Sequence, residues 1–380
     1  MATTLPIEIY LFLFLSRFEV SEEELFACIQ QINHQHDSIN INEICDLALK
    51  NGTAGFVYRN VECSGIFPKP AVKHLRGLYS NYLAHNSRLL KETRYLLEVL
   101  SDNGIPAIPL KGAIASEILF DDLGVYPSGD IDLMVPPSEL AKVKDILCRQ
   151  CGYTQPVKTT EEDLLASHYH LMFTKNDLLC EVHWNCVKRY FNIPAAFWWE
   201  DSREVVQADG TMVSQLSIEK YLLYLIFRLF DHCFYPLRFL VLITGLVSKH
   251  SGEISWDSLI NLAAQLHMRR LTVFVLCLLH EIQGVDIPHH LTNKKVIGHN
   301  LLKRLVFSGI IIGTNNPHLR MATYSLLLDS PSAILSVLLG RLVPSTAELR
   351  LRYNIPVASP LIFFYYILNP FIMFFRSRKP

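Results

Sequence analysis

The chain has 380 residues, of which 50% are hydrophobic and 19% charged, with 35 basic against 36 acidic side chains. Disordered and collagen-like chains are excluded, since they carry fewer apolar residues, more net charge, or far more than 17 Gly and 19 Pro. The near-zero net charge disfavours a protein held to nucleic acid by long-range attraction, while specific phosphate contacts stay open. The length predicts two or three packed units.

Two features bear on location. The apolar run at residues 7–15 follows no Lys or Arg and is interrupted by Glu8, which predicts a helix and not a signal peptide. The nine cysteines are odd in number and scattered, mostly within apolar runs. That usage is typical of a reducing compartment, and we expect a cytoplasmic protein.

The middle of the chain changes from helical to alternating patterns. Apolar residues recur every three or four positions over residues 72–101, which predicts one long amphipathic helix ending near Gly104. We then expect a short buried strand at 105–110, a helix at 113–120, a loop at 121–129, a strand at 131–135, and a helix at 138–151 capped by Ser138.

A β-hairpin is expected next. Two alternating runs, residues 168–174 and 179–185, flank Asn176 and Asp177 as central turn residues. In that register His170 pairs with His183, and Met172 with Glu181. One face is then almost wholly apolar. The other face carries His168, His170, Met172, Glu181, His183 and Asn185.

The fold expected is α+β, with a small mixed sheet flanked by helical regions. Helices are predicted at 218–230, 236–247, 256–267 and 271–282. We divide the chain into an N-terminal helical region (1–101), a catalytic core (102–205), a C-terminal helical domain (206–340) and a basic, aromatic C-terminal segment (341–380).

The sharpest chemical signal is Gly129-Asp130-Ile131-Asp132. In a strand, both aspartates point to one face, an arrangement that is costly unless the two carboxylates share a cation. Mg²⁺ takes oxygen ligands from one or two carboxylates and substrate phosphates. A third carboxylate, Glu181, lies on the polar face of the hairpin, and three such groups can hold two metal ions. On spacing alone, a wet strand end that binds nothing is an equal alternative.

In combination, four motifs resemble one family: Leu110-Lys111-Gly112, the loop from Gly124 to Gly129, Asp130 to Val135, and Glu181-Val182-His183-Trp184. They look like the uncharacterised bacterial nucleotidyltransferases of the DNA polymerase β-like superfamily, whose genes occur beside lasso-peptide and polysaccharide biosynthesis genes. The resemblance extends over most of the chain, including the helical part after Ser217.

The resemblance implies roles for individual residues. Asp130, Asp132 and Glu181 would be the catalytic carboxylates and ligands of Mg²⁺, with Mn²⁺ as an alternative. Glu181 would also act as the base for an acceptor hydroxyl, or as the group that orients the base. Lys111, Gly112 and Gly129 would face the nucleotide phosphates, since glycine lets the backbone approach an anion at a helix N-terminus. Apart from the resemblance, His170 and His183 on the polar face of the hairpin are expected to line a cleft and to contact the nucleotide or the acceptor.

The sequence also departs from this family. Tyr126 stands where relatives often carry an arginine able to clamp the nucleotide, and the superfamily's Gly-Ser pair is missing. Relatives also tend to have an aspartate where this chain has Leu242-Ile243-Thr244. These departures favour, as an alternative to the enzyme, an inactive accessory protein of the same fold.

Other interpretations of the same residues are weaker. A zinc site that combines these histidines with Cys180 is disfavoured, since Cys180 faces away from His170 and His183. Asp231, His232 and Arg238 lie at the end of an apolar helix or follow it, where capping and surface placement explain them better than a role beside the acceptor. The apolar run 361–375 is shorter than the roughly 20 residues of a spanning helix. Core packing explains the C-terminal segment better than peripheral membrane contact, which stays an alternative.

We therefore predict a Mg²⁺-dependent enzyme that moves a nucleoside monophosphate from a nucleoside triphosphate to the hydroxyl of an acceptor, which is a small molecule, a peptide or a macromolecule. Natural-product or polysaccharide biosynthesis is its expected setting, and a toxin-like transferase is a weaker alternative. Asp130→Asn or Asp132→Asn should abolish transfer while leaving the fold intact.

Overall fold

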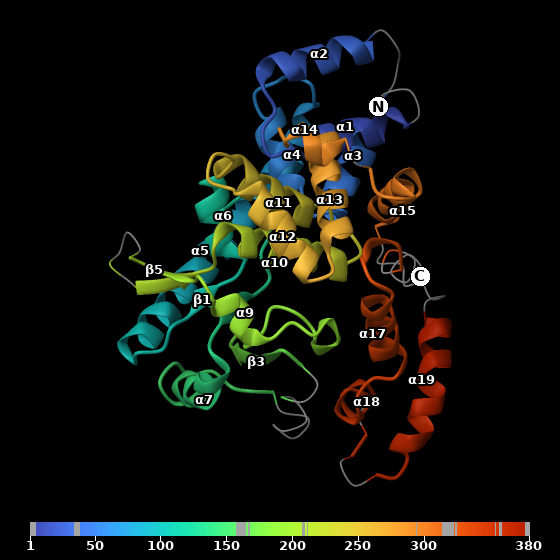
Figure 1. Ribbon diagram of the computed structural model, residues 1–380. Helices are drawn as coiled ribbons and strands as arrows, with labels where there is room; N and C mark the ends of the chain where they lie inside the picture. Colours follow the sequence, from blue (N-terminus) through green and yellow to red (C-terminus); the bar gives the residue numbers. More distant parts are fainter. Residues whose placement is uncertain are drawn as a thin grey trace.

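The computed structural model describes residues 5–33, 39–156, 165, 168–206, 210, 212–293, 295–313, 323, 325–353, 355–356 and 359–376. Figure 1 shows many helices around one small region of strands. A four-stranded mixed sheet and a two-stranded hairpin accompany these helices, so the predicted α+β class with helical flanks is confirmed.

The N-terminal part is helical. Its elements are α1 (Ile7–Leu15), α2 (Glu22–Asn33), α3 (Ile41–Lys50), α4 (Ala54–Val61) and α5 (Lys69–Asp102). The helix predicted at residues 7–15 is confirmed, and so is the long helix, which α5 extends at its start. Gly104 lies just beyond α5 with φ of +68°, a left-handed conformation that glycine adopts at little cost.

The main sheet has the strand order β1-β2-β4-β3. Its strands are β1 (Ile108–Pro109), β2 (Ile131–Met134), β3 (His170–Lys175) and β4 (Leu178–His183). Strand β2 is antiparallel to β1 and parallel to β4. The hairpin of β3 and β4 has the predicted register, with Met172 opposite Glu181 and His170 opposite His183.

Two local predictions differ from the structure. The strand expected over residues 105–110 is present but contains only Ile108 and Pro109, and Pro106, which lacks the N–H that a strand ladder needs, lies before it. Ser138 does not cap a helix. It lies within the 3-10 turn η1 (Pro137–Glu139), and the helix that follows, α7 (Leu140–Arg149), has no side-chain cap.

One face of the sheet packs against helices α5 and α7. Its buried side chains include Leu133, Leu171, Phe173, Cys180 and Val182, which belong to one apolar cluster with residues of those helices. These are residues that the predicted alternation assigns to the apolar face. Asp132, Glu181 and His183 alternate with them, so they lie on the opposite face.

The C-terminal helices share a second core with the N-terminal ones. They are α10 (Ile218–Asp231), α11 (Arg238–Lys249), α12 (Trp256–Gln265), α13 (Arg269–Leu278), η3 (Leu279–Gln283), α14 (His289–Thr292) and α15 (His299–Ile312). Buried residues of α1, α3 and α4 join those of α10, α11 and α13 in one cluster. The four helices predicted between residues 218 and 282 are therefore present, and two distant parts of the chain enclose one core.

Several short elements connect or extend these layers. They are α6 (Ala113–Phe120), η2 (Arg189–Phe191), α9 (Ala195–Trp199), and the strands β5 (Arg203–Val206) and β6 (Met212–Gln215), which form the second sheet. The helix predicted at 113–120 matches α6. The second hairpin was not predicted, and the Ser214 amide of β6 donates to the Ala107 carbonyl beside β1.

The C-terminal segment, residues 341–380, contains α18 (Thr346–Tyr353) and α19 (Ile362–Arg376) and follows α17 (Pro331–Leu342). Helix α17 contacts the catalytic core, since Ser336 donates to the Tyr190 carbonyl, whereas Leu349, Ile355 and Ile362 form a small apolar cluster of their own. Figure 1 shows α19 at the edge of the molecule beside α17 and α18. Apolar side chains of α19 are exposed, including 74% of Phe363 and 66% of Ile367. Arg378 and Lys379 lie outside the described residues. Within the described part of the chain, no helix is long and apolar enough to cross a membrane.

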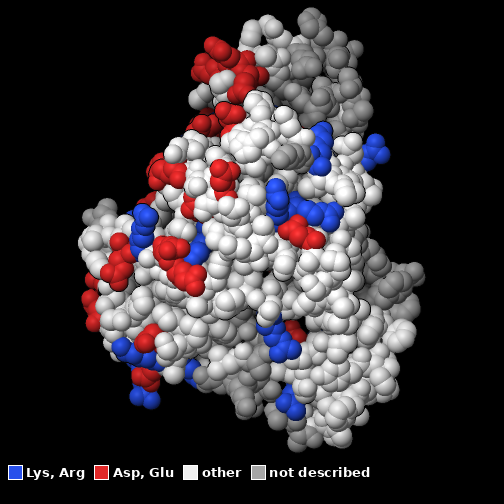
Figure 2. Space-filling model, in the orientation of Figure 1, with Lys and Arg blue, Asp and Glu red and all other residues white. Residues whose placement is uncertain are grey.

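The face shown in Figure 2 carries both basic and acidic side chains, and neither sign covers most of it. Acidic side chains gather at the end of the molecule that contains α2. Three of them, Glu22, Glu23 and Glu24, occupy the first turn of α2, where the helix dipole favours negative charge. Elsewhere on this face basic and acidic residues are interspersed. This pattern agrees with the net charge of −1.

Candidate active site

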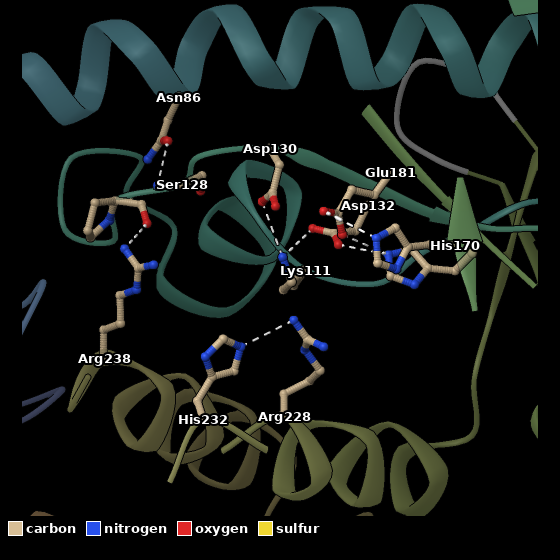
Figure 3. Close-up of polar contacts among 12 residues, drawn as sticks. Asn86, Lys111, Ser128, Asp130, Asp132, His170, Glu181, Arg228, His232 and Arg238 are labelled. Carbon is tan, nitrogen blue, oxygen red and sulfur yellow. Dashed lines mark hydrogen bonds and ion pairs between the residues drawn. The ribbon is translucent and has the colours of Figure 1, made fainter. Parts of the chain in front are cut away.

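Strand register places the three candidate carboxylates together. Asp132 on β2 and Glu181 on β4 are direct partners in the parallel ladder, and Asp130 precedes Asp132 by two residues. One oxygen of each of Asp130, Asp132 and Glu181 lies within 4.8 Å of the others. Figure 3 shows their side chains directed toward one region. Burial differs among them, with Asp132 fully buried and Asp130 the most open at 24% exposure.

The side chain of Lys111 places its own ammonium group between the two aspartates. It follows β1 and precedes α6, and its Nζ lies 3.2 Å from Asp130 Oδ1 and 2.5 Å from Asp132 Oδ2. Only 10% of the side chain is exposed. An ammonium group therefore compensates the charge that makes a buried carboxylate pair costly.

Two histidines border Glu181. His183 Nε2 lies 3.0 Å from Asp132 Oδ1 and 3.4 Å from Glu181 Oε2, while His170 Nε2 lies 3.8 Å from Glu181 Oε1. The two rings are 5.0 Å apart between centroids. Their positions across the β3–β4 ladder follow from the predicted register, so sequence alone indicated that they would be neighbours.

The environment changes the pKa of each carboxyl group differently. Burial raises the pKa of Asp130, and repulsion from Asp132 adds to that rise. Burial also acts to raise the pKa of Asp132, but the Lys111 ammonium and the hydrogen bond from His183 outweigh it and lower that pKa well below its ordinary value. For Glu181, burial is outweighed by the hydrogen bond from His183 and by attraction to His170 when that ring is protonated, so its pKa is lowered. Two of the three carboxyl groups are thus held ionised.

The histidines also differ. Burial, assisted by repulsion from His183, lowers the pKa of His170 to about 4. Burial acts in the same direction on His183, but its hydrogen bonds to Asp132 and Glu181 prevail and raise its pKa. At neutral pH, His170 is therefore a neutral imidazole, which can accept a hydrogen bond or bind a metal ion.

The loop that leads into the carboxylates is fastened to α5. Asn86 is fully buried; its Nδ2 donates to the carbonyls of Leu123 and Tyr126, both at 2.6 Å, and its Oδ1 accepts from the Ser128 amide at 3.3 Å. Three contacts from one amide position the chain immediately before Gly129. The signal in the sequence is a polar residue on the buried side of an amphipathic helix, a position that Thr93 of α5 shares.

Replacing Asn86 with alanine is expected to lower the free energy of unfolding by about 2–3 kcal/mol, because two carbonyls and one amide lose their partner. Urea denaturation measures this loss. The matched control is Asn103→Ala, which removes a side-chain bond to the Val99 carbonyl at the end of the same helix. Equal losses in the two variants would contradict the role given to Asn86.

The two glycines predicted to face phosphates differ in whether backbone conformation and packing require a glycine at that position. Gly112 precedes α6 with φ of +86°, and an added Cβ would lie 3.0 Å from the carbonyl oxygen of Asp130. A side chain there is excluded by conformation and by space. At Gly129, by contrast, an added Cβ would meet no atom of the described residues within 4 Å. Gly129 therefore leaves open space beside the carboxylates and is not required by packing.

Arg228 is a candidate functional residue that the sequence did not single out. It projects from α10 toward Lys111 (Figure 3), donates to the Tyr169 hydroxyl at 2.8 Å and contacts His232 Nε2 at 3.3 Å. Its Nε is buried without a hydrogen-bond partner. Among the described residues, its hydrogen-bond partners are thus a tyrosine hydroxyl and a histidine ring, and neither is a carboxylate.

The other polar residues at this end of α10 have structural partners. His232 is the C-cap residue of α10, and Asp231 accepts from Lys188 Nζ at 3.1 Å. Arg238 donates to the Pro127 carbonyl at 3.0 Å, and its guanidinium lies 5.8 Å from the centroid of the Tyr126 ring. Tyr126 is itself 3% exposed. Arg238 therefore supports the loop before Gly129, and Tyr126 offers no exposed group in place of an arginine.

The donor set fits a hard divalent cation. Three carboxylates provide several oxygens within a small volume, and the ammonium of Lys111 already occupies a position that favours positive charge. Oxygen atoms of this kind are the ligands that Mg²⁺ prefers. Asp130, Asp132 and Glu181 are therefore suited to hold it.

Comparison with known proteins identifies the family. A family described as uncharacterised nucleotidyltransferase matches residues 37–284, about two thirds of the chain. The chain belongs to this family. The matched range includes the carboxylates, Lys111, the histidines and Arg228. No curated protein and no solved structure matches the chain.

Membership in this nucleotidyltransferase family agrees with the acidic cluster at the start of β2 and on β4. The narrower group associated with lasso-peptide and polysaccharide genes stays a prediction. The match ends at residue 284, so α14, α15, α17, α18 and α19 lie outside it. The family assignment therefore concerns the sheet, the site and the helices that enclose them.

Proposed function

We propose that this nucleotidyltransferase moves a nucleoside monophosphate from a nucleoside triphosphate to an acceptor hydroxyl and releases pyrophosphate. The observation that carries the proposal is the convergence of Asp130, Asp132 and Glu181 to within 4.8 Å in a chain of this family. Phosphoryl transfer needs little covalent chemistry from the protein. Positioning and charge neutralisation supply most of the catalysis.

Asp130, Asp132 and Glu181 would hold Mg²⁺, or Mn²⁺ as an alternative, and the bound ion would neutralise charge on the transferring phosphate. Glu181 is the candidate base, because its lowered pKa keeps the carboxylate ionised and able to accept the proton of the acceptor hydroxyl. His183 donates to Glu181 and Asp132 and so orients both carboxylates.

The triphosphate would lie at the N-terminus of α6. Gly112 permits close approach of the backbone there, and the first amides of the helix attract an anion. Lys111 would turn from the aspartates to the phosphates when a divalent cation takes up the carboxylate oxygens. An added Cβ at Gly129 would meet no atom of the described residues within 4 Å, so no side chain there would obstruct the phosphates.

Arg228 would bind the triphosphate in place of the arginine that the loop lacks. Arg228 has no hydrogen bond or ion pair to a carboxylate among the described residues, although Asp132 and Asp231 lie close enough to attract its charge, and a phosphate would be its direct anionic partner. Lys111 and Arg228 approach the same region from different elements, as Figure 3 shows. Together they would hold the phosphates between α6 and α10.

Replacing Arg228 with methionine should weaken triphosphate binding by about 10- to 150-fold, since a charged hydrogen bond contributes about 1.5–3 kcal/mol. Arg228→Lys should recover part of the affinity by restoring the charge. Arg149→Met is the control, because Arg149 is 80% exposed and, within the described part of the chain, its ion pair is with Asp145. Fluorescent-nucleotide binding measures the affinities, and wild-type affinity in Arg228→Met would rule out this role.

An accessory protein that keeps the fold without transfer is the alternative. Burial of Tyr126 favours it, because no side chain at that loop position reaches outward to a nucleotide. Thermal denaturation with Mg²⁺ and each triphosphate separates the two. A ligand at 100 times its dissociation constant adds about 2.7 kcal/mol to stability. The absence of any stabilisation by all four ribonucleoside and deoxyribonucleoside triphosphates would favour the accessory protein.

The acceptor is to be identified by labelling. Triphosphates labelled at the α-phosphate are incubated with the protein and cell extract, with Asp130→Asn as the matched control. The proposed function predicts a labelled small molecule, peptide or macromolecule that forms only with the wild-type protein. Natural-product and polysaccharide intermediates are the first acceptors to test.

A further inference from the structure

A second set of potential metal ligands lies beside the acidic triad and shares one residue with it. His170, Glu181 and His183 each offer one ligand atom, and these atoms all lie within 4.8 Å of one another. His170 is on β3, while Glu181 and His183 are on β4. The set therefore joins two strands of the hairpin at the ladder positions that bring their polar residues together.

The distances suit a small, nitrogen-preferring ion. With metal–ligand bonds of about 2.0–2.1 Å, two ligands of a tetrahedral site are about 3.4 Å apart. The Nε2 atoms of His183 and His170 lie 3.4 Å and 3.8 Å from the two oxygens of Glu181. The 3.8 Å separation is too long for a hydrogen bond. An ion between these atoms would connect His170 and Glu181, which do not hydrogen-bond to each other. It would replace the hydrogen bonds that His183 Nε2 donates to Asp132 and Glu181, and the Nε2 proton would be released on binding.

The ligand chemistry differs from that of the neighbouring triad. Asp130, Asp132 and Glu181 offer oxygen alone, which suits Mg²⁺, whereas imidazole nitrogen suits Zn²⁺ and other divalent transition metals. Two histidines and one glutamate form a known zinc ligand set that leaves a fourth position open. The cysteines are not required, since Cys180 is fully buried on the opposite face of β4.

We propose that His170, Glu181 and His183 form a site for a divalent transition metal of the zinc type, adjacent to the carboxylate site and bridged to it by Glu181. The fourth position of that ion is available to water or to a ligand. This inference goes beyond nucleotidyl transfer, because it concerns metal binding alone and holds for an enzyme or an accessory protein.

The proposal is tested with Co²⁺, a spectroscopic substitute for Zn²⁺, in wild type, His170→Gln and Asp130→Asn. Titration should produce visible absorption bands of nitrogen-ligated Co²⁺ at one equivalent in the wild-type protein. His170→Gln should weaken binding at least tenfold. Asp130→Asn should stay within threefold of wild type, because Asp130 belongs only to the oxygen site.

Three results would overturn the site: no such bands in the wild type, wild-type affinity in a folded His170→Gln, or equal losses in both variants. Circular dichroism establishes whether His170→Gln folds. X-ray absorption by the wild-type protein with one equivalent of Zn²⁺ gives a readout that needs no variant. Scattering from two imidazole rings is expected, and a shell of oxygen ligands alone would refute the proposal. Failure here would leave triphosphate binding and transfer untouched.

Discussion

Asp130→Asn is expected to abolish nucleotidyl transfer while keeping the free energy of unfolding within about 1 kcal/mol of wild type, whereas Asp132→Asn should lower it by about 3–5 kcal/mol. Burial and the neighbouring Asp132 already disfavour the ionised form of Asp130, so an amide at this position removes an unfavourable charge. Lys111 retains its contact with Asp132 at 2.5 Å. Asp132→Asn instead leaves Lys111 and His183 without their shared carboxylate.

Urea denaturation of both variants in the absence of divalent ions measures this difference. The sequence alone predicts that both substitutions leave the fold intact. The structure leads us to expect this for Asp130→Asn alone. The sequence indicated two carboxylates that needed a cation, but it did not indicate that Lys111 supplies one. Equal stability of the two variants would contradict the asymmetry in burial and charge between Asp130 and Asp132.

Lys111→Met should make the stability of the protein depend on divalent cations. Methionine has a similar length but no charge, so Asp130 and Asp132 would face each other without the ammonium that lies between them. Breaking such a buried pair costs about 3–5 kcal/mol. Mg²⁺ should restore much of that loss, because it would occupy the carboxylates without competition from Lys111.

The measurement is the melting temperature with and without 10 mM Mg²⁺, compared with Lys249→Met. Lys249 contacts Asp121 and is 38% exposed, so its loss should have a small effect that Mg²⁺ does not reverse. A Mg²⁺-dependent increase confined to Lys111→Met supports the carboxylates as the cation site. No increase would mean that the carboxylates do not bind Mg²⁺ even when the ammonium is removed.

Sequence reasoning predicted the hairpin best. Asn176 and Asp177 determine where the strands turn, and Asn176 adopts the left-handed conformation, with φ of +54°, that asparagine tolerates. Because side chains alternate in a strand, one turn position then assigns Glu181, His170 and His183 to a common face. The parallel pairing of β2 with β4 brought Asp132 opposite Glu181. Local rules therefore assigned these side chains to their faces, whereas the pairing of β2 with β4 joins parts of the chain that are distant in sequence.

Contacts between distant parts of the chain were not predictable in the same way. Lys220 and Arg228 are both cations within the apolar helix α10, and periodicity does not distinguish them. Lys220 donates to the Glu200 carbonyl at 2.5 Å, while Arg228 projects toward Lys111. Asn86 holds a loop whose contacted residues, Leu123 and Tyr126, lie 37 and 40 positions further along the chain. Such roles depend on tertiary packing, which no short motif encodes.

The most direct test of the central claim is binding of Mn²⁺ with a non-hydrolysable triphosphate, measured by electron paramagnetic resonance in wild type and in Asp130→Asn. If Asp130, Asp132 and Glu181 hold the nucleotide's metal, Asp130→Asn should bind the Mn²⁺–triphosphate complex at least 100-fold more weakly while remaining folded. Affinities within threefold of each other would show that the metal-bound nucleotide lies elsewhere.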